Sequence, residues 1–416
     1  MSDDPTLDPS LRSWVVVPED SDFPIQNLPL GQIDRGGNDL AAAVRIGDHV
    51  LDLRGAADAG VLDVPRGGLT LLHGLLFLER PKWRALRERV SELLSDPRHR
   101  AAVAPHVRPV ADVEVLLPVR VRDYVDFYSS IEHATNLGRM FRPHQEPLLP
   151  NWRWLPVGYH GRGGTIVPSG APVHRPRGIV RRGDAVPAYE PSGQLDVELE
   201  MGFLTGGAPN RPGEPIPIDR AGQHIVGLVL VNDWSARDVQ AFEYQPLGPF
   251  LGKSFATSIS PWIVTLDALA PYRVPGPGQD PPPLPHLRTD EPWAFDIELE
   301  MALQTPGMPE PATISRTNLR HLYWSMAQQL AHATSNGASA QPGDLFATGT
   351  ISGAEPGTQG SLIELTWGGE RPLELPDGST RTFLEDGDTV VLRAWAGGDG
   401  RPRIGFGECR GTILPG

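Results

Sequence analysis

The sequence contains almost no cysteine and no long hydrophobic segment. Its single cysteine, Cys409, has no internal partner, so a disulfide within the chain is excluded and a reducing compartment such as the cytosol is favoured. The longest apolar run, residues 225–231, is too short to cross a bilayer. The acidic, polar start of the chain lacks the pattern of a secretory signal. We therefore expect a cytoplasmic protein with no membrane partner.

Positive charge is also scarce. The chain carries 37 Lys and Arg against 51 Asp and Glu, which gives a formal net charge of −14. Because nucleic acids and anionic lipids attract basic surfaces, this balance argues against both as partners. The motifs HExxH, CxxC and GxSxG are absent as well, which weakens the case for a zinc hydrolase or a serine hydrolase.

Glycine and proline, by contrast, are abundant, with 46 and 44 residues. Together with an apolar fraction of 39%, they indicate many short strands joined by turns, not disorder. Apolar and polar residues alternate, as in half-buried strands, over residues 194–203, 293–303, 361–367 and 388–395. A second long helix, beside the one described next, is predicted over residues 316–337. A mainly β fold with few helices follows.

The length of the chain suggests two domains. The clearest helix, over residues 81–96, falls within a small β-rich N-terminal domain at residues 13–118. The larger domain then covers residues 119–416. Residues 1–12 are expected to form a loose leader, because chain ends are poorly ordered unless they are tied down.

A helix start places one histidine in a favourable position for catalysis. Ser129 followed by Glu132 has the spacing of a capping box, and Gly138 can end the helix. His133 then lies at the positive end of the helix dipole, which disfavours the imidazolium form. A neutral imidazole is what a general base requires. The open alternative is a surface histidine on a short helix, and nearby Asp126 is by itself an ordinary turn residue.

A buried strand ends abruptly in polar residues that are candidates for ligand binding. The apolar run 225–231 leads into Asp233, and strand ends are common positions for functional groups. A helix over residues 235–244 would follow and carry Arg237. Lys253 lies among glycines, but their spacing is not that of a phosphate-binding loop. Taken alone, both cations are more typical of solvated surface charge.

Two segments of nearly the same sequence each carry two acids on one strand face. LDVELEMGF contains Glu198 and Glu200, and FDIELEMAL contains Glu298 and Glu300. Carboxylates are hard ligands, so acids without cysteine favour Ca²⁺ or Mg²⁺. The spacing does not decide which pair would hold a cation.

Other polar residues are less distinctive. Eight arginines lie between residues 139 and 182 against a single acid, Glu146, so this stretch could receive an anionic small molecule, with Arg142 as the best candidate. Most of the other arginines are expected to pair with acids elsewhere. Glu364 falls on the polar side of an expected strand, where it could face solvent or orient a histidine.

Several longer motifs, taken together and in this order, resemble those of the fumarylacetoacetate hydrolase family. They are DFYSSIEHATNLG, LDVELEM, NDWSARDVQ, PLGPFLGKSF, GTISG and IGFGEC. The resemblance implies a small SH3-like N-terminal β-barrel followed by a C-terminal β-roll that forms a homodimer. It also implies hydrolysis of a carbon–carbon bond in a diketo dicarboxylate, 4-fumarylacetoacetate, to fumarate and acetoacetate. That reaction is the last step of tyrosine and phenylalanine degradation.

The resemblance further implies roles for individual residues. The implied residues for a Ca²⁺ site and a second, Mg²⁺ position are Asp126, Glu198, Glu200, Asp233, Lys253 and Thr257. The implied catalytic residues are His133, Glu364, Arg237, Gln240 and Lys253. The implied substrate contacts are Tyr128, Arg142, Tyr159, Gln240, Tyr244 and Thr350. In these roles His133 activates water, Glu364 orients His133, and the cations stabilise developing negative charge.

The second acid pair departs from the family pattern, so Glu298 and Glu300 are expected to be exposed or paired with arginine. Two alternatives remain. One is another enzyme of the same superfamily, a hydrolase, hydratase or decarboxylase acting on acylpyruvates or 2-oxo acids. The other is a β-rich binding protein in which a metal is structural and His133 has no catalytic part.

Overall fold

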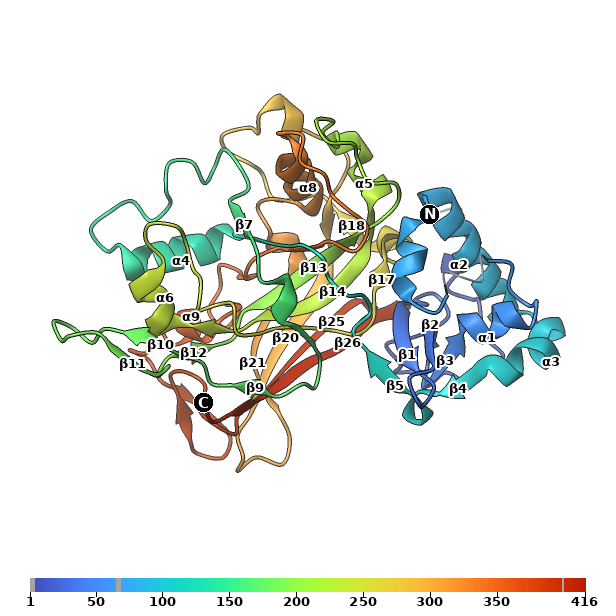
Figure 1. Cartoon of the computed structure of the whole chain (residues 1–416), viewed down its shortest axis with the longest axis horizontal. Helices are drawn as coiled ribbons and strands as arrows, with labels where there is room; N and C mark the ends of the chain where they lie inside the picture. The colour runs from blue at the N-terminus through green and yellow to red at the C-terminus, as the bar shows by residue number, and fades with distance from the viewer. Residues whose placement is uncertain (1–3, 65–68, 399) are drawn as a thin grey trace.

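The computed structural model of the chain describes residues 4–64, 69–398 and 400–416. It confirms the predicted mainly β fold class, and the strands fall into a smaller N-terminal and a larger C-terminal part that lie side by side (Figure 1). Within these described ranges, no helix is both long and apolar enough to cross a bilayer.

An antiparallel five-stranded sheet forms the N-terminal part. In spatial order its strands are β4 (Val107–Pro109), β3 (His49–Asp52), β2 (Leu40–Ile46), β1 (Leu30–Asp34) and β5 (Glu114–Leu116). Figure 1 shows this sheet on the right, with α-helices around it. They are α1 (Leu53–Asp58), α2 (Arg80–Ser95) and α3 (Arg100–Val103).

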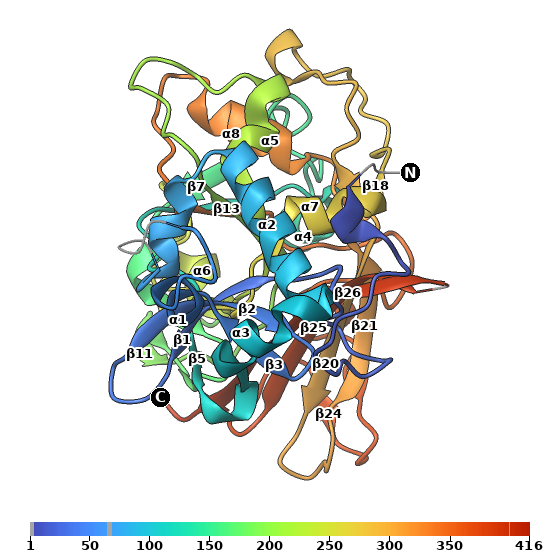
Figure 2. The ribbon, with the colours of Figure 1, turned by 90° about the vertical axis from the view of Figure 1, so that its right-hand side faces the viewer.

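Helix α2 is the predicted helix 81–96, and it buries the expected apolar stripe. Trp83, Leu86 and Val90 are at most 9% exposed and pack into the N-terminal core. Pro81 lies in the first turn, where a helix needs no N–H group. Figure 2 shows α2 beside α7 (Leu266–Leu269) of the C-terminal part.

The expectation of a loose leader is wrong for the residues from Asp4 onward. Thr6 is 3% exposed, and the buried Arg87 donates from Nε to Thr6 Oγ1 at 2.9 Å. Gln26 Nε2 donates to the carbonyl oxygen of Asp8 at 2.7 Å. These hydrogen bonds, with Leu11 packed against the N-terminal core, attach the segment, and its polar composition did not reveal the attachment.

Two sheets build the C-terminal part. The larger contains β7 (Gly158–His160), β6 (Tyr124–Phe127), β22 (Leu345–Ala347), β13 (Leu199–Thr205), β14 (Ile225–Asp233), β16 (Thr257–Ile259) and β8 (Ile166–Pro168) in that order, with β17 (Val264–Thr265) also paired to β14. The smaller contains β21 (Ala312–Asn318), β20 (Ile297–Gln304), β25 (Thr389–Gly398), β26 (Arg401–Leu414) and β9 (Val173–His174). One hydrophobic cluster joins them, and it includes Phe203 and Phe346 from the first and Leu299 and Leu392 from the second.

The helix predicted over residues 316–337 is wrong in its first half. Residues up to Asn318 belong to β21, which pairs with β20, and only α8 (Met326–Thr334) is α-helical. A complete capping box between Ser325 and Gln328 starts α8. The helix therefore begins only at this later capping box. The residues before it have helical periodicity, but they form a strand because β20 is available for pairing.

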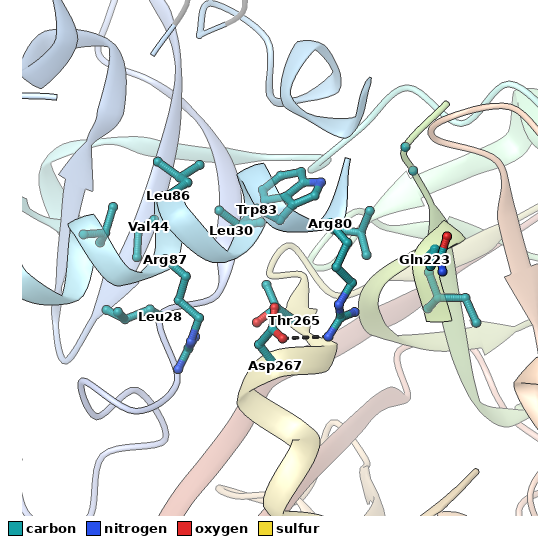
Figure 3. A pocket seen from close by; sticks show the side chains of 15 residues that line it. Leu28, Leu30, Val44, Arg80, Trp83, Leu86, Arg87, Gln223, Thr265 and Asp267 are labelled. Atoms are coloured by element: carbon teal, nitrogen blue, oxygen red, sulfur yellow. Dashed lines mark hydrogen bonds and ion pairs between the residues drawn. The ribbon is translucent and has the colours of Figure 1, made fainter. Parts of the chain in front are cut away.

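The two parts share a core. Leu30 of β1 exchanges both backbone hydrogen bonds with Ile263, at 3.0 and 2.8 Å. Arg80 of α2 donates to Asp267 of α7 at 2.6 Å (Figure 3). A cavity of about 30 Å³ beside this ion pair is lined mainly by apolar side chains such as Trp83, so it has room for about one water molecule and not for a substrate.

Candidate active site

The larger sheet opens onto a cavity of about 390 Å³. Most of the predicted site residues line it, although they come from distant segments. They are Asp126, Tyr128, His133, Arg142, Tyr159, Glu198, Arg237, Gln240, Tyr244, Lys253 and Thr350. The remaining predicted residues, Glu200, Asp233, Thr257 and Glu364, lie behind these side chains and are each at most 4% exposed. The structure thus brings the whole predicted set to one place.

His133 is held between a helix cap and a buried carboxylate. Its backbone N–H donates to Ser130 Oγ at 3.3 Å, and its Nδ1 lies 2.6 Å from Glu364 Oε2. A carboxylate at Nδ1 retains the proton there, which leaves the Nε2 lone pair free. Nε2 lies 4.0 Å from Glu198 Oε1 in the cavity wall. The imidazole is therefore arranged as a proton acceptor facing the cavity.

Three further side chains fix the carboxylate of Glu364. Ser352 and Ser361 donate to Oε2 at 2.9 and 2.7 Å, and Asn136 donates to Oε1 at 3.0 Å. Burial alone would raise the pKa of Glu364, but His133, Asn136 and Ser361 hold it below its ordinary value. Sequence reasoning missed all three serine and asparagine donors, because isolated serine and asparagine residues carry no spacing signal.

Two local expectations around this pair need correction. The cap of α4 (Ile131–Phe141) is Ser130 rather than Ser129, and α4 continues through Gly138 instead of ending there. A Cβ at Gly138 would lie 2.0 Å from the carbonyl oxygen of Pro147, so the glycine permits close packing. Glu364 lies on a short helix, α9 (Leu362–Leu365), and not on a strand.

An acid cluster lies at the floor of the cavity. Ligand oxygens of Asp126, Glu200 and Asp233 lie within 4.8 Å of one another. These residues belong to β6, β13 and β14 of the same sheet, whose spatial order brings them together. Burial, followed by the charge of Asp233, raises the pKa of Asp126 to about 7, and burial with Asp126 raises that of Glu200 as well.

The cluster fits a divalent cation. Asp126 Oδ1 and Glu200 Oε1 are buried and have no hydrogen-bond partner among the described residues. Leaving buried charged oxygens unpaired is costly, and a hard cation satisfies such oxygens directly. The geometry therefore supports a Ca²⁺-type or Mg²⁺-type site without distinguishing the two metals.

Glu198 stands beside this cluster and not in it. Its carboxylate pairs with Lys253 Nζ through Oε2 and lies 2.8 Å from Arg237 Nη2 through Oε1. Burial would raise its pKa, but Lys253 and Arg237 bring it below the ordinary value. Lys253 also donates to Asp233 Oδ2 at 2.6 Å, and Thr257 Oγ1 donates to Asp233 Oδ1 at 3.1 Å. The predicted metal residues thus form a continuous network of charge.

Arg162 is an unexpected member of that network. Its guanidinium donates to Asp126 Oδ2 at 2.8 Å and to Asp233 Oδ1 at 2.6 Å. It also lies 4.9 and 5.0 Å from the ring centroids of Tyr124 and Tyr159. Among the arginines of residues 139–182, sequence reasoning had favoured Arg142, whose Nη2 instead donates to the Pro147 carbonyl oxygen at 2.9 Å.

The second acid pair contributes nothing to the cavity. Glu300 is paired with Arg316 at 2.7 Å and with Arg393 at 3.1 Å, and Glu298 is exposed and accepts from Asn318 Nδ2 at 2.8 Å. The expectation that Glu298 and Glu300 are exposed or paired with arginine is confirmed.

Comparisons with known proteins agree with this geometry. Residues 26–118 match the model described as fumarylacetoacetase N-terminal, and residues 123–414 match fumarylacetoacetate (FAA) hydrolase C-terminal. The chain belongs to the fumarylacetoacetate hydrolase family. Fumarylacetoacetases of Rattus norvegicus and Arabidopsis thaliana are 48% and 47% identical to it, each over 97% of this chain and 99% of the relative.

A solved structure of the family shares the fold. The fumarylacetoacetate hydrolase from psychrophilic Exiguobacterium antarcticum superposes with a TM-score of 0.53 at 17% sequence identity. The match covers 93% of this chain and 99% of that one.

Proposed function

We propose that the chain hydrolyses the carbon–carbon bond of 4-fumarylacetoacetate to fumarate and acetoacetate, the last step of tyrosine and phenylalanine degradation. One observation carries the proposal: a buried His133–Glu364 pair, an acid cluster and the cations Arg237 and Lys253 converge on one cavity. Relatives that share nearly the full length and carry the name fumarylacetoacetase support the substrate.

The reaction needs a base and a place for developing negative charge. His133 Nε2 accepts a proton from water, and Glu364 stabilises the imidazolium that forms. Attack on the carbonyl carbon next to the scissile bond creates an oxyanion, and Arg237, Gln240 and Lys253 supply positive charge and donors to it. The carbon–carbon bond then breaks, which releases fumarate and leaves the electron pair on the acetoacetate fragment as its enolate. A proton from the imidazolium converts this enolate to acetoacetate.

The cavity wall suits a dicarboxylate with two ketones. Arg142 supplies a cation for a terminal carboxylate. Tyr128, Tyr159 and Tyr244 offer hydroxyl donors along the wall, and Gln240 and Thr350 complete the contacts. Thr350 Oγ1 is buried without a hydrogen-bond partner in the described structure, which leaves it free for a substrate oxygen.

The proposed metal ligands are the buried acids of the site. Asp126, Glu200, Asp233 and Glu198 would hold Ca²⁺, and Lys253 and Thr257 would mark a neighbouring Mg²⁺ position beside Asp233. A divalent cation in this cluster supplies Lewis acidity toward the ketone oxygens of the substrate. For Glu198 to join the ligands, its carboxylate has to exchange an ion pair with Lys253 for the metal.

A spectroscopic assay tests the function directly. The ultraviolet absorbance of fumarylacetoacetate should decay with purified protein, and chelation of the metal should abolish the decay. Decay only with shorter acylpyruvates would favour the alternative enzyme of the same superfamily. No decay with either substrate would favour the binding protein.

The organisation of the active protein is part of the proposal. We expect domains at residues 13–118 and 119–416, and a cytoplasmic homodimer. Hydrophobic side chains on the hairpin of β10 (Arg177–Val180) and β11 (Ala188–Pro191) support a partner surface, because Ile179, Val186 and Tyr189 are 48%, 88% and 67% exposed. Light scattering on the eluting protein should give twice the 45.2 kDa chain mass.

A further inference from the structure

A buried carboxylate outside the cavity connects the two groups that the proposed reaction needs. Asp196, in β12 (Leu195–Asp196), is fully buried and does not line the cavity. Arg237 donates from Nε to Asp196 Oδ2 at 2.8 Å. The backbone N–H groups of Leu362 and Ile363 donate to Oδ1 at 2.8 Å and to Oδ2 at 3.2 Å. One side chain therefore holds an arginine and the start of a helix.

The helix in question carries Glu364. Ser361 precedes α9 but does not cap it, because its Oγ donates to Glu364 Oε2 instead. The first N–H groups of a helix have no partner within the helix, and Asp196 accepts two of them here. Glu364 Oε2 lies 2.6 Å from His133 Nδ1. By anchoring the start of α9, Asp196 therefore fixes Glu364, and through Glu364 it fixes the orientation of the base.

The arginine in question faces the cavity. Arg237 begins α6 (Arg237–Glu243), and its Nη2 lies 2.8 Å from Glu198 Oε1. Its Nη1 donates to Gln240 Oε1 at 3.2 Å. A guanidinium is planar, so anchoring Nε sets the direction in which both Nη groups point. Asp196 thereby aims the charge that the oxyanion requires.

We propose that Asp196 is a positioning residue. It holds the base, His133, and the cation that stabilises the oxyanion, Arg237, at a fixed position relative to each other. It touches neither substrate nor metal residues directly, and it acts through Glu364 on one side and Arg237 on the other. The proposal rests on the proposed function, in which both groups act on one carbonyl carbon. A displacement of one group relative to the other by a fraction of an ångström lowers turnover, because reacting atoms must lie at near-attack distances.

The variant Asp196→Asn tests the proposal. An amide of the same shape places its NH₂ donor either at the Oδ2 position, against Arg237 Nε and the Ile363 N–H, or at the Oδ1 position, against the Leu362 N–H. In both orientations α9 loses an acceptor. We expect kcat to fall by about 10²–10³-fold, as when an oxyanion donor is removed. KM should stay close to the wild-type value, because the cavity wall is untouched.

A matched control separates positioning from general destabilisation. Asp388 is also fully buried, accepts from Arg381 Nε and Nη2 at 2.8 and 2.9 Å, and accepts from the backbone N–H of Glu385 at 2.8 Å. It is not among the residues that line the cavity. Asp388→Asn should lower the melting temperature and leave kcat unchanged. Equal losses of kcat in the two variants would overturn the proposal, as would wild-type kcat in Asp196→Asn.

A double variant keeps the test decisive if Asp196→Asn alone does not fold. Asp196→Asn with Arg237→Gln removes both buried charges together and avoids an unpaired arginine. Its kcat should lie below that of Arg237→Gln alone, since α9 has still lost its acceptor. The additional loss should be smaller than the loss that Asp196→Asn causes in the wild type. Equal kcat values for the double variant and Arg237→Gln would overturn the link through α9.

Hydrogen exchange gives a readout that does not depend on the substrate. In Asp196→Asn, the amides of Leu362 and Ile363 should lose protection while those of β13 keep it. Unchanged protection at both amides would overturn the proposal. If instead the wild type fails to hydrolyse fumarylacetoacetate, the proposed function falls, and this measurement still reports whether Asp196 anchors α9.

Discussion

His133 and Glu364 are 2% and 4% exposed, so removing either side chain leaves the other as a buried polar group that has lost its hydrogen bond. In the acid cluster, two buried oxygens already have no hydrogen-bond partner within the described part of the chain. The roles of such buried side chains can be told apart only by a variant that changes one measured quantity and leaves another unchanged. The proposed base and the proposed metal residues of this site can be distinguished in that way.

The first residue-scale prediction concerns the base. His133→Gln should lower turnover by about 10²–10⁴-fold, because the glutamine side chain cannot accept the proton from water. Ca²⁺ binding, measured by calorimetric titration, should remain as in the wild type, since His133 is not part of the acid cluster. Turnover like that of the wild type would remove His133 as the base.

The second residue-scale prediction uses the duplicated acid pairs as an internal control. Glu200→Gln should weaken Ca²⁺ binding by at least about tenfold, because a charged ligand with a free oxygen is lost. Glu298→Gln combined with Glu300→Gln should leave the affinity nearly unchanged, since these side chains interact with Asn318 and with arginines instead. The reverse ranking in a calorimetric titration would mean that the wrong pair had been assigned.

At the scale of elements, the sequence predicted those features that depend on local spacing. The apolar stripe of α2 and the alternation in β13 and β20 follow directly from periodicity, and the structure contains all three elements. Features that depend on a distant partner were not predictable. Asp196 and Arg162 look like ordinary charged residues until the fold places them against Arg237, α9 and the acid cluster.

The same limit explains the local errors. The strand expected around Glu364 is the helix α9, because the backbone N–H groups of Leu362 and Ile363 find an acceptor in Asp196 rather than in a neighbouring strand. The residues before α8 form β21 because β20 offers a pairing edge. The family motifs predicted a set of residues that the fold places around one cavity, without revealing which side chains hold them in place.

Gly138 gives an element-scale prediction. Gly138→Ala would add a Cβ at 2.0 Å from the Pro147 carbonyl oxygen, so α4 and the segment that follows it have to move apart. We expect a loss of about 1–3 kcal/mol in the free energy of unfolding. KM should rise as well, because Pro147 and Leu148 line the cavity.

The control for Gly138→Ala is Gly164→Ala, which lies in a position where an added Cβ meets nothing within 4 Å. Urea unfolding and steady-state kinetics on both variants compare the two effects. Equal stability and equal KM in the two variants would contradict a packing role for Gly138.

At the scale of the whole molecule, the N-terminal part supports the site without entering it. All residues that line the 390 Å³ cavity lie between Asp126 and Thr350. The strands that carry this wall nevertheless contribute Tyr124, Val231 and Leu345 to the hydrophobic cluster that contains Leu30 and Leu86 of the N-terminal part. A shared core of this kind couples the unfolding of the two parts.

Cys409 makes that coupling measurable. It is the single cysteine of the chain, is fully buried in β26, and donates from Sγ to the Ser258 carbonyl oxygen at 3.3 Å. Burial raises the pKa of its thiol well above the ordinary range, so at pH 8 the native protein contains almost no thiolate. Because the thiolate is the reactive form, an aromatic disulfide reagent should not label the native protein.

In increasing urea, Cys409 should become reactive in the same transition in which the helical circular dichroism of the chain is lost. A core shared between the two parts predicts a single cooperative step for both signals. Cys409→Ser supplies the blank, because it removes the only thiol. Labelling that precedes the loss of circular dichroism would show that β26 opens while helices elsewhere in the chain remain folded. In that case β26 would not unfold together with the rest of the chain, and the shared core that contains Leu30, Leu86 and Val231 would not make unfolding a single step.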